Sequence, residues 1–239
     1  MERYNRQVMI DKIGKEGQKR LAKASVAVIG VGGLGSPILT YLALAGVGRL
    51  TIIDYDCVEM SNLNRQFLHG TEDVGALKVE SAKRKLNQMN HEVEINPLAI
   101  KLTKNNGEGL LSGHDLVMGA LDSTETRFIV NEACVNLGIP YIDGGVKEFG
   151  GSVVFTNPPD TPCYNCVFPK KVGEKERVGV LGVTAGIIGA IEADIAIIYL
   201  LGLANPLKDK ILVVDGLRLS MNLVDIVADD MCEVCGLGS

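Results

Sequence analysis

A glycine-rich loop near the N-terminus, followed by an acid, could bind the phosphates and the ribose of a nucleotide. The loop reads GVGGLGS over residues 30–36, directly after the apolar run SVAVI, and Asp54 ends the next apolar run. Such glycines let the backbone approach phosphate, the following helix offers N–H donors, and a carboxylate can hold ribose hydroxyls. The pattern does not say which nucleotide. On this motif alone an NAD-dependent oxidoreductase is the larger class, and a tight turn without a ligand is the plain alternative.

Charged side chains beyond this loop favour a reaction at the phosphates. Arg65 and Lys78 follow the second predicted strand, and Asp122 follows the fourth. Hydride transfer needs no cations on a phosphate chain. Attack of a carboxylate on the α-phosphorus of ATP builds charge that Arg and Lys neutralise, while an acid can hold Mg²⁺. The alternatives are solvated surface charges for Arg65 and Lys78, and a helix N-cap for Asp122.

Two cysteine pairs, Cys163-x-x-Cys166 and Cys232-x-x-Cys235, could hold a metal ion. Four thiolates in closed tetrahedral geometry suit a structural Zn²⁺, which would tie the C-terminal tail to the loop before the long helix. The alternative is two redox-active dithiols, but neither pair opens a helix after a strand in a thioredoxin-like pattern. The two single cysteines are interpreted as packing residues, half-buried for Cys57 and in the core for Cys134.

The apolar pattern predicts the elements that position these residues. Strands are expected at 25–29, 49–56, 92–100, 115–122 and 140–146, and helices at about 37–45, 74–90 and 125–137. This βαβ alternation predicts an α/β fold with a Rossmann-like, doubly wound and mostly parallel sheet. Surface helices are expected within 2–23. Strands at 151–157 and 210–216 are expected to extend the sheet antiparallel, and no linker is long enough to split the chain, so we expect a single domain over 1–239.

Composition and charge exclude several other classes of protein. Of the 239 residues, 46% are hydrophobic and 22% are charged, and the net charge of −5 gives no basic field for nucleic acid. The stretch 178–204 is apolar enough for a membrane span. However, Glu192 and Asp194 lie in its middle, where an unpaired charge costs about 2.5–3.5 kcal/mol, so we expect a loop and a buried helix. The N-terminus lacks an apolar signal core, which favours the cytoplasm.

Six motifs occur in an order that is known from one family. They are RYNRQ, GVGGLGS, DYDCVEMSNLNRQFL, GALKVESA, LDSTETR and PCYNC…CEVCG, between about residues 3 and 236. Together they resemble the ThiF/MoeB/HesA family of ubiquitin-activating-enzyme-like adenylyltransferases. The resemblance implies a homodimer that binds ATP and Mg²⁺. It also implies adenylylation of the C-terminal glycine of a ubiquitin-like sulfur-carrier protein ending in Gly-Gly, with release of pyrophosphate.

The resemblance also implies roles for single residues. Residues 24–150 would form the nucleotide-binding half, and residues 151–239 the half that binds the carrier and zinc. Asp122 would serve the Mg²⁺, and Arg6 would reach the nucleotide of the other subunit. The residues implied in catalysis are Arg6, Arg65, Lys78 and Asp122. Those implied in nucleotide binding are Gly30, Gly32, Gly33, Gly35, Asp54, Asp56, Asn62, Asn64, Arg65, Gln66, Lys78, Leu121 and Asp122.

The sequence departs from part of this family at one position. Some members carry a catalytic Cys shortly before the GVLGV segment, where this chain has Lys175 within a charged segment, 170–177, that we expect to be a loop. A lysine ammonium cannot perform thiol exchange. We therefore predict no covalent cysteine step, and a separate sulfurtransferase or downstream enzyme that attacks the adenylate. Adenylation of a peptide or small carboxylate, and nucleotide binding without catalysis, stay open as alternatives.

Overall fold

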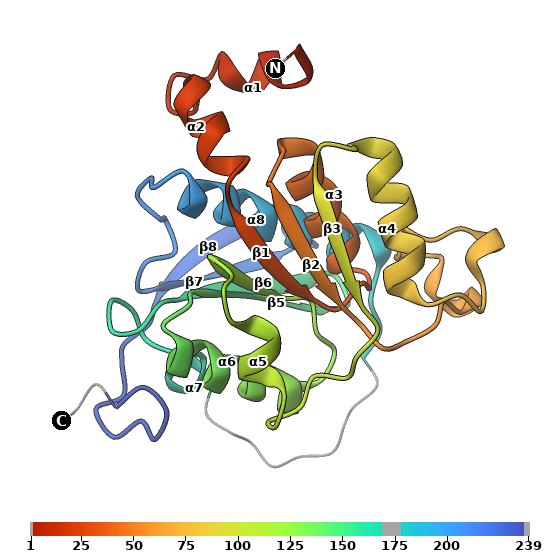
Figure 1. The fold of residues 1–239 in the computed structure, drawn as a ribbon. Coiled ribbons are helices and arrows are strands. Elements are labelled where there is room, and N and C mark those ends of the chain that lie inside the picture. The colour runs from red at the N-terminus through yellow and green to blue at the C-terminus, as the bar shows by residue number, and fades with distance from the viewer. Residues whose placement is uncertain (1, 169–177, 237–239) are drawn as a thin grey trace.

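One mixed sheet of eight strands forms the centre of the molecule, with helices on both faces (Figure 1). The computed structural model describes residues 2–168 and 178–236. The strands lie in the order β3-β2-β1-β4-β5-β6-β7-β8. Their bounds are Ser25–Ile29 (β1), Arg49–Ile53 (β2), Glu94–Leu98 (β3), Leu116–Gly119 (β4), Tyr141–Lys147 (β5), Gly150–Thr156 (β6), Lys210–Asp215 (β7) and Ser220–Asp225 (β8).

The sheet has a parallel half and an antiparallel half, as the sequence predicts. β1 pairs with β2 and β4, β2 with β3, and β4 with β5, all in parallel. β5 to β8 then pair with one another antiparallel. Parallel strands covered on both faces read as unbroken apolar runs, and every residue of β1 and β4 is buried. The carboxyl ends of β1, β2 and β4 therefore meet at one edge, where an open α/β sheet binds its ligands.

Two hydrophobic cores lie on the two faces of this sheet. α3, α4 and α8 cover one face, and α5, α6 and α7 cover the other (Figure 1). α3 ends at Gly46, whose positive φ of 79° suits a left-handed C-cap. The helix bounds are Asn5–Val8 (α1), Gly14–Leu21 (α2), Gly35–Ala45 (α3), Lys78–Met89 (α4), Gly107–Leu111 (α5), Thr124–Leu137 (α6), Tyr164–Val167 (α7) and Gly182–Leu200 (α8).

The apolar stretch 178–204 contains the helix that the sequence predicts there. α8 passes a length and composition test for a membrane span, which core helices also pass. It packs against α3, β5 and β6, and its Glu192 is fully buried in these contacts. The packing agrees with the interpretation of a helix inside a folded domain rather than one in lipid.

Several predicted boundaries are wrong for identifiable reasons. The helix expected at 74–90 begins only at Lys78, because Gly75 has a φ of +90° and Leu77 forms an isolated antiparallel bridge with Cys57. The second and fourth strands end before their acids, at Ile53 and Gly119, because the chain turns there into the site described below. The edge strand β8 and the short helices α5 and α7 were not predicted.

Candidate active site

The glycine loop between β1 and α3 is packed so closely that side chains are excluded. Gly30 has a φ of +97°, and a Cβ atom there would lie 2.3 Å from the carbonyl oxygen of Ala120. A Cβ atom at Gly35 would lie 2.2 Å from the carbonyl oxygen of Gly30. Distances below 3 Å are inside van der Waals contact, so both positions require glycine. The sequence therefore places bare backbone at the edge where the strands end.

Asp54, directly after β2, holds this loop through its side chain. Its Oδ2 accepts the backbone N–H of Val31 at 2.8 Å, and its Oδ1 accepts that of Asp56 at 2.9 Å. Burial raises the pKa of Asp54, while Lys78 and these two N–H donors act to lower it. The carboxylate thus orients the loop from the neighbouring strand, a role that the sequence motif did not reveal.

Lys78 opens α4 and points back toward the acids that follow β2. Its Nζ lies 2.8 Å from Oδ2 of Asp56, and its side chain is only 8% exposed. A solvated surface charge would be far more exposed, so that alternative for Lys78 is wrong. The half-exposed Asp56 keeps this buried ammonium paired at the rim of the crevice.

The turn after Glu59 brings Arg65 and Gln66 against the loop. A Cβ atom at Gly33 would lie 3.5 Å from Cγ of Arg65, and one at Gly32 would lie 3.5 Å from Nε2 of Gln66. The half-buried Arg65 donates from Nη1 to the Ser61 carbonyl at 3.0 Å and to Oδ1 of Asn64 at 2.9 Å. Asn62 is buried and accepts the Glu59 backbone N–H at 3.1 Å, which fixes the start of the turn.

The first turn of α8 closes the other side of this loop. The methyl group of Ala185 would lie 3.3 Å from a Cβ atom at Gly33. Gly182 approaches the Asn64 carbonyl so closely that a Cβ atom there would lie 2.5 Å from it. A segment nearly 150 positions later in the sequence therefore packs against the glycine loop, and sequence patterns gave no signal for this contact.

Asp122 and Leu121 follow β4 at the same edge of the sheet. Ser123, rather than Asp122, is the N-cap of α6, since its Oγ accepts the Thr126 backbone N–H at 3.4 Å. The N-cap alternative for Asp122 is therefore wrong. Its carboxylate is exposed and can act as an oxygen ligand, the type that Mg²⁺ prefers. Arg127 donates to the Leu121 carbonyl and so fixes the segment that carries Asp122.

A buried polar cluster behind this segment was missed by the sequence analysis. Arg127 also forms an ion pair with Asp143, which accepts the Tyr141 hydroxyl at 2.6 Å. Glu192 on α8 is fully buried against Gly144, where a Cβ atom would lie 2.2 Å from its Oε2. Burial raises the pKa of Asp143 to about 6 and that of Glu192 well above its ordinary value. The sequence signal for this cluster was the presence of two acids, Asp143 and Glu192, within apolar runs.

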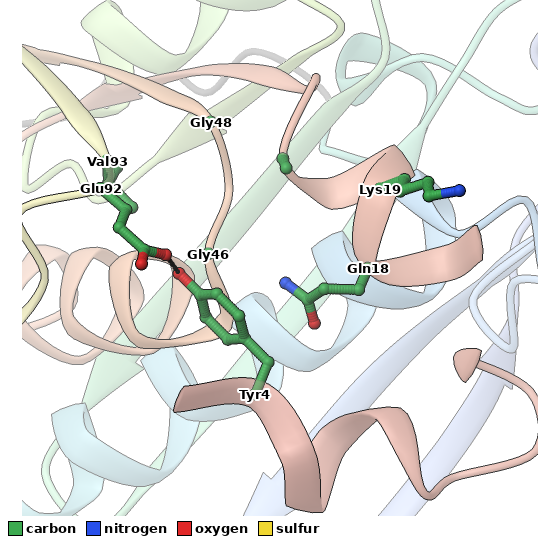
Figure 2. Close-up of a pocket in the computed structure, with 8 residues that line it drawn as sticks. Tyr4, Gln18, Lys19, Gly46, Gly48, Glu92 and Val93 are labelled. Carbon is green, nitrogen blue, oxygen red and sulfur yellow. Dashed lines mark hydrogen bonds between the residues drawn. The ribbon is translucent and has the colours of Figure 1, made fainter. Parts of the chain in front are cut away.

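Arg6 lies far from the other candidate residues of its own chain. The N-terminal helices pack beyond the start of β1, whereas the glycine loop follows its end (Figure 1). The Tyr4 hydroxyl donates to Glu92 at 2.9 Å and accepts from Asn90 at 2.8 Å. Figure 2 shows the Tyr4 ring next to Gly46, beside a cavity of about 210 Å³. The exposed Arg6 is thus held on an anchored segment at the amino end of the sheet.

The four paired cysteines converge, as their spacing predicts. Cys163 Sγ lies 3.8 Å from Cys166 Sγ and 3.6 Å from Cys232 Sγ, and Cys166 Sγ lies 3.6 Å from Cys235 Sγ. A tetrahedron of thiolates about 2.3 Å from Zn²⁺ has edges of about 3.8 Å. The donor set and its spacing therefore fit a structural zinc ion.

Predictions were also made for the two single cysteines and for Lys175. Cys134 is buried, as predicted, and burial raises the pKa of its thiol. Cys57 is exposed, so the expectation of half-buried packing is wrong: it follows the end of β2, and its backbone forms a bridge with Leu77. Lys175 and the predicted loop at 170–177 lie outside the described residues.

Comparisons with known proteins find relatives over nearly the whole length of the chain. A family model described as "ThiF family" matches residues 4–234. The chain is 40% identical over 246 residues to the "Sulfur carrier protein adenylyltransferase" of Thermus thermophilus, covering 99% of this chain and 91% of that protein. It is 38% identical over 243 residues to the "SAMP-activating enzyme E1" of Haloferax volcanii, covering 100% and 90%.

Solved structures share the fold. A crystal structure of E. coli MccB with AMPCPP and MccA has a TM-score of 0.89 and 25% identity, and covers 98% of this chain and 74% of that one. A second, of E. coli MccB with ATP, has a TM-score of 0.88 and 25% identity, and covers 99% and 75%.

Proposed function

Since the chain belongs to the ThiF family, and its relatives are adenylyltransferases, we propose that it adenylates the C-terminal glycine of a ubiquitin-like sulfur-carrier protein. ATP and Mg²⁺ would be the co-substrates and pyrophosphate the leaving product. The observation that carries the proposal is the gathering of Arg65, Lys78 and the glycine loop at the one edge that also presents Asp54 and Asp122.

For this reaction the protein would need to position the substrates and neutralise charge. A carboxylate is already ionised near neutral pH, so no general base is needed. Lys78 and Arg65 would neutralise the charge that builds on the α-phosphate as the carboxylate attacks and pyrophosphate leaves. Asp54 would hold the ribose, and Asp122 would hold Mg²⁺, which supplies Lewis-acid stabilisation of the phosphates when bound. The backbone of the loop would donate N–H groups to the phosphates.

We propose a homodimer in which Arg6 serves the partner's nucleotide. Within one chain the five residues of β1, about 16 Å long, separate the start of the strand, where Arg6 is anchored, from the crevice at its end. Arg6 can therefore contribute to a nucleotide site only across an interface. A C2 interface would place both arginines equivalently, one at each site.

The reaction is proposed to stop at the adenylate. The sequence holds no cysteine between Cys166 and Cys232, so a thioester or persulfide link from the segment 170–177 has no donor. A sulfurtransferase or other downstream partner in the cytoplasm would then attack the adenylate. Incubating enzyme, ATP and carrier and running a non-reducing gel checks this: a reducible covalent adduct in high yield would refute it.

A second candidate is adenylation of the carboxylate of a different substrate. It is favoured by the likeness to the Microcin C7 biosynthetic enzyme MccB, whose structures are described with MccA rather than a sulfur carrier. Nucleotide binding without turnover is the remaining alternative.

Exchange of labelled pyrophosphate into ATP separates these candidates. We expect exchange that depends on a carrier ending in Gly-Gly and disappears when the carrier's last glycine is deleted. Exchange driven only by a peptide or small carboxylate would favour the second candidate. No pyrophosphate exchange with any carboxylate, in a preparation that still binds ATP, would favour nucleotide binding without catalysis.

A further inference from the structure

His69 contacts two of the segments that build the nucleotide crevice and belongs to the third. It ends the turn that carries Arg65 and Gln66, and its ring is buried. Its Nε2 lies 3.1 Å from the carbonyl oxygen of Val31 in the glycine loop. Its Nδ1 lies 2.9 Å from Oγ of Ser81, which is one helical turn after Lys78. One imidazole therefore joins the loop, the turn and the start of α4.

The contacts fix which nitrogen carries the proton. A carbonyl oxygen only accepts, so Nε2 of His69 carries a proton and donates to Val31, while Nδ1 lies beside the Ser81 hydroxyl, a group that can donate or accept. Burial is the main cause that lowers the pKa of His69, and Lys78 and Lys85 act in the same direction. The Val31 hydrogen bond and Asp73 act to raise it. Burial thus favours the neutral ring, and the Val31 contact places its proton on Nε2.

The bond to Val31 sets the direction of a neighbouring N–H group. The Val31 carbonyl and the Gly32 N–H belong to one planar trans peptide, so they point in opposite directions. His69 holds the carbonyl toward its own ring, so the Gly32 N–H points the other way, away from His69. On the other side of Val31, Asp54 holds the backbone N–H at 2.8 Å. Both backbone groups of Val31 are thus held by side chains from outside the loop.

We propose that His69 is a positioning residue for ATP: it aims the Gly32 N–H at the phosphates and fixes the distance between the loop and the Lys78 end of α4. This inference rests on the proposed nucleotide site. His69 touches no substrate in this role, and it contributes by keeping the donors in place before ATP arrives.

His114 provides a matched control within the same chain. Its ring is half-buried and makes two contacts. Nδ1 lies 2.9 Å from the Leu111 carbonyl oxygen, and Nε2 lies 2.8 Å from Thr51 Oγ1. It follows α5 and precedes β4, at the amino end of the sheet, away from the crevice. Equivalent changes at the two histidines therefore each remove two contacts of a ring, but only those at His69 disturb the glycine loop.

The experiment compares His69→Gln, His69→Asn and the same two changes at His114. The Gln amide can place a donor where Nε2–H lies, whereas Asn is too short to reach Val31. We expect His69→Asn to weaken ATP binding about tenfold, the loss of one buried hydrogen bond, and His69→Gln to stay within about threefold of the wild type. The His114 variants should bind ATP like the wild type, although Asn lowers the melting temperature at both positions.

Calorimetric titration with ATP in the absence of any carrier gives the affinities, and a thermal melt of the same samples gives the stabilities. Equal affinities for the Gln and Asn variants at position 69, or a loss at His69 no larger than at His114, would overturn the proposal. Carrier-dependent pyrophosphate exchange by the wild type is measured separately. Its absence would count against the proposed function and leave the comparison of ATP affinities intact.

Discussion

Replacing two lysines of α4 by methionine should separate catalysis from stability. Lys78 Nζ lies 2.8 Å from Asp56, whose side chain is 49% exposed. Lys85 Nζ, two turns further along the helix, lies 2.7 Å from Asp73, whose side chain is 0% exposed. The two ion pairs have similar lengths. They differ in the surroundings of the carboxylate that remains when the lysine is removed: Asp56 is half-exposed, whereas Asp73 is buried.

The two variants should therefore fail in different ways. After Lys78→Met, water can solvate Asp56, so the free energy of unfolding should fall by no more than about 1 kcal/mol. Loss of one cation at the phosphates should reduce kcat/KM for exchange about 10²- to 10³-fold. After Lys85→Met, the buried Asp73 keeps Arg84 as its one cationic partner among the described residues, so the free energy of unfolding should fall by about 1–3 kcal/mol. Its exchange activity should stay within about twofold.

Urea unfolding and carrier-dependent pyrophosphate exchange on the same three proteins measure both effects. The reasoning is refuted if Lys78→Met keeps more than about a third of the wild-type activity, because a phosphate cation is worth far more than that. It is refuted equally if Lys85→Met loses as much activity as Lys78→Met while both remain folded.

Glu192, the cysteine cluster and Arg6 each allow a further test. Burial raises the pKa of Glu192 above its ordinary 4.5, so the wild type loses about 1.4 kcal/mol of stability per pH unit above that value until the folded-state pKa is reached. Asp143, whose pKa is raised to about 6, contributes a slope of the same sign below that pH, so the comparison is made above pH 6. There Glu192→Gln should reduce the slope in urea unfolding by about 1.4 kcal/mol per pH unit, and an unchanged slope would contradict the pKa shift. The purified protein should carry about one zinc per chain by elemental analysis. Cys232→Ser should lower both the zinc content and the melting temperature, whereas Cys57→Ser should change neither. Arg6→Ala and Asp122→Ala variants, each inactive alone, should regain about a quarter of the wild-type activity when unfolded and refolded together, since half the dimers would then hold one intact site. No regain would rule out a shared site.

The parallel half of the sheet could be predicted because local patterns determine it. The run at 25–29 is apolar throughout, and the glycines that follow it have no tolerable substitute at Gly30 and Gly35. β8 escaped prediction because its residues are largely exposed, so no buried face imposes a readable alternation. The start of α4 was misplaced because charge pattern alone does not report the extended turn at Gly75 and Leu77.

The candidate site was predictable where its residues follow strands, and not where they meet through space. Arg65, Lys78 and Asp122 were found because carboxyl ends of parallel strands share one edge. His69 and Glu192 were missed because each contacts residues that are distant in the sequence, Val31 for His69 and Gly144 for Glu192. A buried histidine or acid looks like any other polar residue until the element that covers it is known.

A crystal structure with a non-hydrolysable ATP analogue and Mg²⁺ tests the central claim most directly. The account predicts the triphosphate on the glycine loop, with nitrogen atoms of Lys78 and Arg65 about 2.7–3.2 Å from phosphate oxygens and Asp122 at the metal. A triphosphate bound to the loop while these three side chains point into bulk water would contradict it.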